Sequence, residues 1–168
     1  MIRRLALALL LASALINSVS AVEMLLVPIT TAIAQTVGQT FQSRPGPGGQ
    51  FLPATMTIQC NLTWGSGGTT VDADIQTSLD GGTTWTDVAN CNFATIAASK
   101  RLIWTLESSL VAAPVQVATP TDGGMTANTA LSGVFGTMWR VKYQTTGVFA
   151  GGTTLRIDAI ANGLTSLP

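Results

Sequence analysis

Alternation of apolar and polar residues constrains the fold of this chain more than any other feature. Between residues 56 and 64 every second side chain is apolar, and the intervening ones are threonine, glutamine or asparagine. A period of two is typical of a β-strand that buries one face. We predict similar strands at residues 71–78, 85–88, 102–106, 115–118, 137–144 and 155–161. Short strands between glycine-rich turns predict an all-β protein, and we expect an antiparallel, jelly-roll-like β-sandwich.

Few side chains in this sequence are suited to catalysis. Of 168 residues, 8 are lysine or arginine, 8 are aspartate or glutamate, and none is histidine. Without histidine the chain cannot form a Ser-His-Asp triad or a histidine-ligated metal site. A net charge of zero also argues against a surface that neutralises nucleic-acid phosphates. We therefore expect no enzyme activity, no cofactor, no bound metal and no nucleic-acid partner.

The first 34 residues are similar to a secretory leader. Two arginines precede an apolar run at residues 5–16, which is too short to span a bilayer as a helix. Small residues that suit a signal peptidase end at Ala21 and again at Ala34. Three interpretations stay open: cleavage at one of these sites, translation from Met24, or retention of the segment as an apolar arm. We expect no stable membrane span.

A turn-rich segment separates this arm from the main group of strands. Residues 44–49 contain two prolines and three glycines, which continue neither a helix nor a strand ladder. We therefore divide the chain into a signal-like or apolar arm at residues 1–34, a linker at 35–50 and a β-sandwich domain at 51–168.

One predicted hairpin carries a motif. Residues 78–85 fit the pattern S-x-D-x-G-x-T-W, with its defined positions at Ser78, Asp80, Gly82, Thr84 and Trp85. The pattern resembles the Asp-box of sialidases and other secreted β proteins. In that family the box is a folding element away from the catalytic pocket, so the resemblance implies a structural hairpin. The aspartate is expected to cap backbone N–H groups in the turn, with the tryptophan packed beneath it.

Cys60 and Cys91 are the only cysteines in the sequence. We expect a disulfide between them if the chain is exported, and buried thiols if it stays in a reducing compartment. In the chain-entropy model, the loop that such a bond closes would stabilise the fold by about 3–4 kcal/mol.

Charged side chains gather on the polar sides of the predicted strands. If the apolar side chains point inward, six charged residues point outward, and together they form a candidate docking face: Asp72, Asp74, Arg140, Lys142, Arg156 and Asp158. A solvated sheet face is the simpler interpretation. A cation site at the two neighbouring aspartates is disfavoured, because a flat strand leaves most of a calcium shell unfilled. The four tryptophans lie in predicted strands, and we assign them to the core, with a sugar-stacking platform of exposed, coplanar rings as the alternative.

The strands and turns of residues 51–161 resemble small, low-charge β proteins from the structural gene clusters of tailed phages and prophages. The resemblance rests on residues 55–71, the 78–85 hairpin, and residues 140–147 followed by 151–157. It implies a virion protein, either a capsid decoration or cement protein or a neck or tail accessory subunit. Such a protein binds other virion proteins, and we expect a homo-oligomer. The alternative is a secreted or periplasmic carbohydrate-binding β-sandwich module, and a subunit of a surface fibre is a third class.

Overall fold

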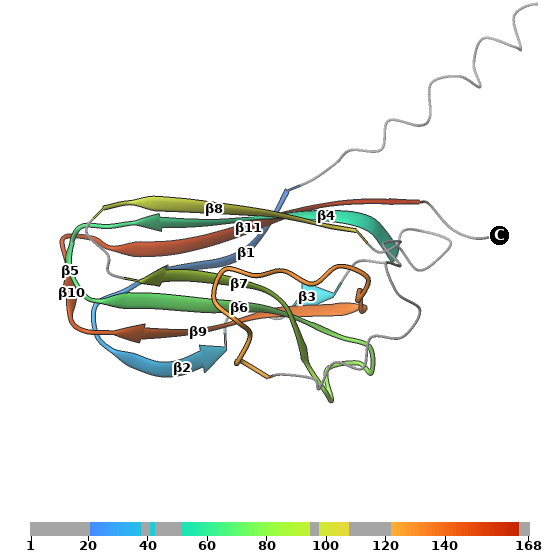
Figure 1. Cartoon of the computed structure of the whole chain (residues 1–168), viewed down its shortest axis with the longest axis horizontal. Helices are drawn as coiled ribbons and strands as arrows, with labels where there is room; N and C mark the ends of the chain where they lie inside the picture. The colour runs from blue at the N-terminus through green and yellow to red at the C-terminus, as the bar shows by residue number, and fades with distance from the viewer. Residues whose placement is uncertain (1–20, 38–40, 43–51, 95–97, 108–121, 165–168) are drawn as a thin grey trace, which may run out of the picture.

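The computed structural model describes residues 21–37, 41–42, 52–94, 98–107 and 122–164. All regular secondary structure in these residues is β-strand, and every strand pairing is antiparallel, which confirms the predicted all-β class. The main strands lie in two layers that face each other (Figure 1). None of the described segments forms a helix with the length and apolar character needed to cross a membrane.

The first layer, called sheet 1 here, has four strands in the order β1-β11-β4-β8. Their bounds are Ala21–Pro28 for β1, Thr154–Leu164 for β11, Leu52–Thr63 for β4 and Lys100–Glu107 for β8. Apolar and polar residues alternate along β4, so its apolar side chains share the inner face of the sheet. Ile58, Cys60 and Leu62 are almost fully buried there.

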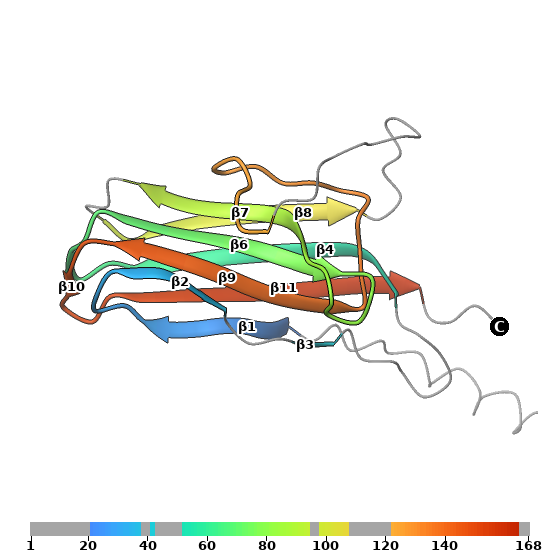
Figure 2. The ribbon, with the colours of Figure 1, turned by 90° about the horizontal axis from the view of Figure 1, so that it is seen from below.

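The second layer, called sheet 2, follows the order β2-β9-β6-β7, and the short strand β3 also pairs with β9. The bounds are Ile33–Val37 for β2, Met138–Thr146 for β9, Thr70–Ser78 for β6, Thr86–Ala94 for β7 and Phe41–Gln42 for β3. At one end of the molecule, β5 (Ser66–Gly67) pairs with β10 (Phe149–Ala150). Figure 2 shows β7 and β8 together along one side, and β1 and β2 along the other.

The chain order of the strands changes sheet at six connections. Four of them join strands at corresponding positions in the two sheets: β1 to β2, β4 through β5 to β6, β7 to β8, and β9 through β10 to β11. The other two lead from β3 to β4 and from β8 to β9. One crossing needs a glycine: Gly68 has φ +69°, and an added Cβ would lie 2.0 Å from the ring of Phe149. Because every crossing joins opposite layers, both sheets close around a single core.

The core fills the space between the layers with the inward side chains of both sheets. Val71 and Ile75 of β6 and Trp139 of β9 are fully buried there. Cys60 of β4 and Cys91 of β7 meet in this core as a disulfide, with their Cα atoms 6.5 Å apart. The bond therefore links sheet 1 to sheet 2 across the interior.

The predicted boundary between an arm and a domain starting at residue 51 is wrong. β1 pairs with β11 from Ala21 to Pro28, and β2 pairs with β9. Met24 is 0% exposed and Ile29 is 1% exposed, so the apolar stretch that resembles a leader supplies core side chains instead. Cleavage after Ala34 would remove β1 and these side chains, whereas cleavage after Ala21 would leave them in place. Residues 1–20 lie outside the described part of the chain.

The strand predictions match the structure in part. The β7 strand extends to Ala94, well beyond the predicted end at residue 88, because its polar residues Asn90 and Asn92 also belong to the ladder. The predicted strand at 115–118 and the Pro/Gly-rich residues 44–49 fall outside the described residues.

We predict that Met24→Ala destabilises the protein by about 2–5 kcal/mol, because it leaves a cavity in the core. Leu26→Ala is the matched control, since Leu26 lies on the same strand but is 53% exposed. The control should change the free energy of unfolding by no more than about 0.5 kcal/mol. Urea unfolding of both variants measures the difference, and equal effects would show that β1 does not pack as described.

The disulfide gives a second prediction. Replacing both cysteines by alanine should lower the free energy of unfolding by about 3–4 kcal/mol, because an unfolded chain without the bond gains entropy. The sequence separation of 31 residues sets this magnitude. Mass spectrometry of native protein measures the bond directly, and two free thiols at Cys60 and Cys91 would contradict it.

Candidate functional site

The six charged residues predicted to share one docking face lie on opposite faces of the molecule. Asp72 and Asp74 of β6 and Arg140 and Lys142 of β9 belong to sheet 2, whereas Arg156 and Asp158 belong to β11 in sheet 1. The single-face prediction is therefore wrong. Alternation places each residue on the outer side of its own strand, but it does not say to which sheet the strand belongs.

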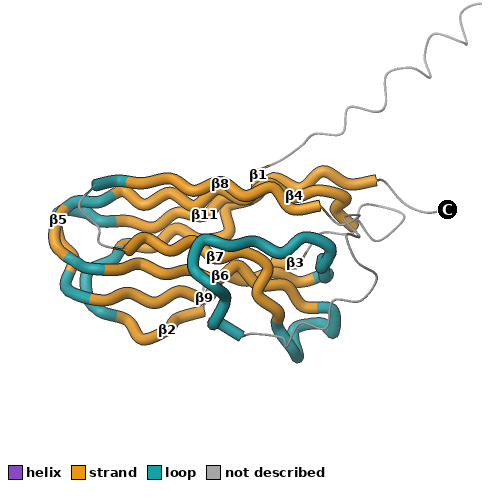
Figure 3. Tube along the Cα trace, in the orientation of Figure 1, coloured by secondary structure: helices purple, strands orange, loops and turns teal. Residues whose placement is uncertain are grey.

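A long connection before β9 covers the outer face and the edge of sheet 2. We call residues 122–137 the strap, which crosses in front of β7 in Figure 3. Along the edge of β7, the Asn90 N–H donates to the Thr129 carbonyl at 2.9 Å, and the Leu131 N–H donates to the Val88 carbonyl at 2.8 Å. The strap then reaches β8, where the Gly133 N–H donates to the Glu107 carbonyl at 2.8 Å. It therefore joins the edges of both sheets.

Asp87 anchors the start of the strap. Its carboxylate accepts hydrogen bonds from the Gly123 N–H at 3.0 and 3.1 Å and from the Gly124 N–H at 3.1 Å. A β-bulge makes this contact possible, because the register shifts between Ile75 and Gln76 and turns Asp87 to the outer side. Gln76 also donates to this carboxylate, and Asp87 is only 2% exposed.

Asp122 connects the strap to two strands of sheet 2. Its Oδ1 accepts hydrogen bonds from Gln76 Nε2 at 2.9 Å, Arg140 Nη2 at 2.8 Å and Lys142 Nζ at 3.1 Å. The hydrogen bond from Gln76 contributes most to lowering the pKa of Asp122 below its usual value, followed by the interactions with the two cations. Arg140 also stacks over the ring of Trp85 at 4.3 Å, a cation–π contact worth about 0.5–1 kcal/mol.

Asn90 occupies the position between the two aspartates of β6. Its Nδ2 donates to Asp72 Oδ1 at 2.9 Å and to Asp74 Oδ1 at 2.8 Å, while its Oδ1 accepts from the Asn128 N–H of the strap at 3.0 Å. An amide group thus stands where a bridging cation would have to bind. Within the described residues, no cluster of three or more Cys, Asp or Glu side chains is arranged to hold a metal ion.

Burial makes Asp74 electrostatically unusual. Its pKa is raised from 3.8 to about 6, mainly because the carboxyl is removed from water and also because the carboxylates of Asp87 and Asp72 lie nearby. The hydrogen bond from Asn90 and the charge of Lys142 oppose this shift in pKa. The network therefore contains one carboxyl group that gains a proton close to neutral pH.

The structure brings the five residues of the 78–85 motif together in one turn. Asp80 Oδ1 accepts hydrogen bonds from the Thr84 N–H at 2.8 Å, the Thr83 N–H at 3.0 Å and Ser78 Oγ at 2.8 Å. These bonds, led by those from Thr84, lower the pKa of Asp80 to about 2. Trp85 Nε1 donates to the Gly82 carbonyl at 3.0 Å and closes the turn. The side chains are engaged in holding the hairpin.

The four tryptophans do not form an exposed platform. Trp139 is fully buried, and Trp64, Trp85 and Trp104 are half-buried. Trp64 and Trp104 pack against the core, while the ring of Trp85 lies under Arg140.

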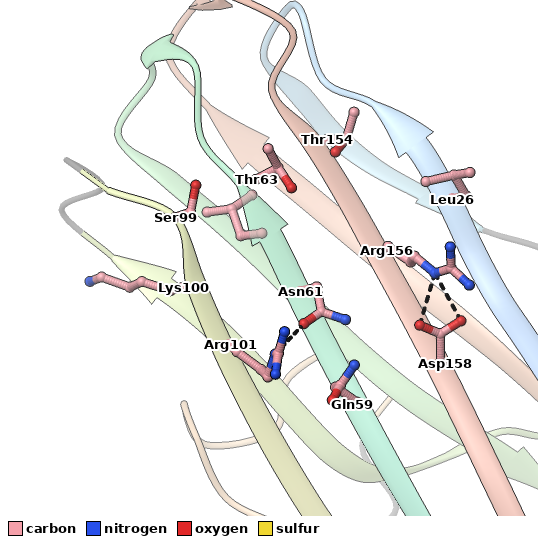
Figure 4. Close-up of a pocket in the computed structure, with 11 residues that line it drawn as sticks. Leu26, Gln59, Asn61, Thr63, Ser99, Lys100, Arg101, Thr154, Arg156 and Asp158 are labelled. Atoms are coloured by element: carbon pink, nitrogen blue, oxygen red, sulfur yellow. Dashed lines mark hydrogen bonds and ion pairs between the residues drawn. The ribbon is translucent and has the colours of Figure 1, made fainter. Parts of the chain in front are cut away.

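The outer face of sheet 1 differs from that of sheet 2 because the described segments leave it uncovered. Figure 4 shows its polar rows, with Arg156 Nε donating to both oxygens of Asp158 at 3.0 and 2.9 Å. On the next strands, Arg101 Nε donates to Asn61 Oδ1 at 2.8 Å. Large apolar side chains are exposed on this face: Leu26 at 53%, Ile103 at 56% and Ile160 at 37%.

Several residues of the site were missed by sequence reasoning. Gln76 lies two residues after Asp74, on the same polar side of the strand as Asp72 and Asp74, so the alternation in the sequence is enough to place it on this face. Asp87, Asn90 and Asp122 carry no local signal, because a bulge and a non-local loop bring them to the sheet.

Within the described part of the chain, these contacts leave sheet 2 with an internally bonded polar face and sheet 1 with an uncovered one. The chain matches no known family model, no curated protein and no solved structure.

The raised pKa of Asp74 predicts that the stability of the protein depends on pH. Because its pKa is raised in the folded state, its contribution to stability is fully present below about pH 4 and is lost as the pH rises through 6. The free energy of unfolding should therefore fall between pH 4 and 7, and Asp74→Asn should flatten this slope. Asp80→Asn is the control, because the lowered pKa of Asp80 places its effect below pH 4. Urea unfolding at each pH measures the slopes, and an unchanged slope in Asp74→Asn would contradict the assignment.

Proposed function

We propose that this chain is a jelly-roll-like β-sandwich that acts as a non-enzymatic structural protein of a phage particle. The strand orders β1-β11-β4-β8 and β2-β9-β6-β7 support the fold assignment. Strands at the same position in the two orders follow one another in the chain, apart from the short β5 and β10: β1 and β2, β9 and β11, β4 and β6, and β7 and β8. Jelly rolls of eight strands occur in viral capsid and lectin domains. Since a fold does not by itself fix a function, the role is argued from the surface.

The contrast between the two outer faces carries this proposal. Around Asp74, Asp87 and Asp122, the polar groups of sheet 2 are engaged with the strap. Sheet 1 presents hydroxyl and amide rows with exposed Leu26, Ile103 and Ile160 among them. Protein interfaces combine apolar contacts with a polar rim in this way, and they need no reactive centre.

Low charge supports the same role. Only 10% of the residues are charged, so docking of the face removes few ions from water. We place the protein on the capsid as a decoration or cement protein, or on the neck or tail as an accessory subunit, in several copies that contact other virion proteins.

The carbohydrate-binding alternative is less well supported. It depends on exposed tryptophan rings, and all four tryptophans lie among the described residues with none of them exposed. A secreted or periplasmic location follows from that alternative and not from the proposed role.

Association with particles tests the proposal. The native chain should copurify with density-gradient phage particles at a fixed copy number, and Ile103→Glu should abolish this association by placing a charge in the interface. Leu79→Glu is the matched control, because Leu79 is 72% exposed at the hairpin tip of sheet 2. Absence from particles, or equal loss in both variants, would contradict the proposal. Glycan-array binding that requires a tryptophan would favour the alternative.

A further inference from the structure

The free edge of β8 shows how a partner is recognised on sheet 1. β8 is the last strand of the sheet, and among the described strands it pairs only with β4. In an antiparallel ladder the N–H and C=O of one residue point to the same side, and successive residues alternate. Glu107 directs both groups away from β4, because its N–H donates to Ser132 Oγ at 3.2 Å and its C=O accepts from the Gly133 N–H at 2.8 Å.

The same alternation fixes the direction of the preceding residues. The register between β4 and β8 has no shift, so Arg101, Ile103 and Thr105 also point their N–H and C=O groups away from β4. No described residue pairs with these groups, because the strap contacts this edge only at Glu107. Among the described residues, the first half of β8 therefore presents an open strand edge.

Two cations at the start of this edge have no carboxylate partner among the described residues. Arg101 Nε donates to the neutral Asn61 at 2.8 Å, and the side chain of Lys100 makes no hydrogen bond or ion pair with any described residue. Both line an open groove of about 660 Å³ beside β4, as Figure 4 shows. By contrast, Arg156 in the same groove is paired with Asp158. The excess positive charge is thus confined to the β8 side.

An exposed apolar side chain follows Arg101 on the same side of the strand. Ile103 is 56% exposed and lies two residues after Arg101, a spacing of about 6.6–6.8 Å along a strand. An added strand would place its own side chains directly opposite these two, about 4.5–5.5 Å away. The complementary segment is therefore extended, with a carboxylate opposite Arg101 and an apolar residue two positions away.

We propose that the edge of β8 between Lys100 and Thr105 binds an extended acidic segment of a partner protein by strand addition. Backbone hydrogen bonds to Ile103 and Thr105 supply affinity, and the cations select acidic partners. The assignment of the partner as a protein rests on the proposed function, whereas the strand edge and its charges do not.

A second copy of this chain fits the edge less well. The strap occupies the edge at Glu107 in each copy, so two antiparallel β8 strands could overlap only through their first halves. That overlap, centred on Ile103, would place Arg101 of each copy opposite Thr105 of the other, so neither arginine would face a carboxylate directly. Charge therefore favours an acidic partner over self-pairing.

Amide hydrogen exchange with a peptide probe tests this inference. The probe is an acetylated heptapeptide of Thr residues with one Val and one Asp, in which Val precedes Asp by two positions so that in antiparallel pairing they lie opposite Ile103 and Arg101, and the full chain is used. In the free chain, the amides of Ile103 and Thr105 should exchange quickly, while those of Leu102 and Trp104, which point to β4, exchange slowly. The probe should slow exchange at Ile103 and Thr105. Slow exchange at these amides without the probe would show that another segment already occupies the edge, and would overturn the inference.

Charge variants provide the matched comparison. The double variant Lys100→Gln and Arg101→Gln should weaken probe binding by about tenfold or more. Lys142→Gln changes one charge on the opposite sheet and should leave binding unchanged. Equal binding of a peptide with Lys in place of Asp, or equal loss in both sets of variants, would contradict charge selection.

Tight binding of polygalacturonate without amide protection would identify a polysaccharide partner and overturn strand addition. Probe binding without particle association would overturn the proposed function alone.

Discussion

Burial of one side of every strand is the constraint on which the rest of the structure depends. Each strand exposes alternating side chains to two faces, and the apolar row can leave water only against a second sheet. Residues as distant as Met24, Ile58 and Trp139 therefore meet in one interior. The disulfide between Cys60 and Cys91 holds the same two layers together by a covalent link.

Within the described part of the chain, one outer face is covered and the other is open, which makes the two faces of the molecule different. The strap uses backbone N–H groups to bind Asp87 and uses Asp122 to bind Arg140 and Lys142. Several polar groups of sheet 2 are thereby satisfied within the chain, at the cost of burying Asp74. Sheet 1 has no such cover in the described part of the chain, which leaves its face and the edge of β8 available for binding.

Sequence patterns predicted the class of fold and the hairpin at residues 78–85, because both depend on local periodicity and turn chemistry. They failed where the chain departs from periodicity. The bulge beside Ile75 reverses the side on which Asp87 lies, and no residue type marks it. They also misassigned residues 21–34, since an apolar edge strand and a leader segment have similar composition. Charged residues from both sheets were assigned to a single face, because alternation shows on which side of a strand a residue lies but not to which sheet the strand belongs.

The most direct test of the account is hydrogen exchange on the protein bound to the phage particle on which we propose that it acts. We predict that binding protects β8 and the neighbouring strands of sheet 1, while the amides of the strap exchange as they do in the free protein. Protection confined to the strap and to sheet 2, with sheet 1 unchanged, would contradict the claim that the uncovered face is the one that docks.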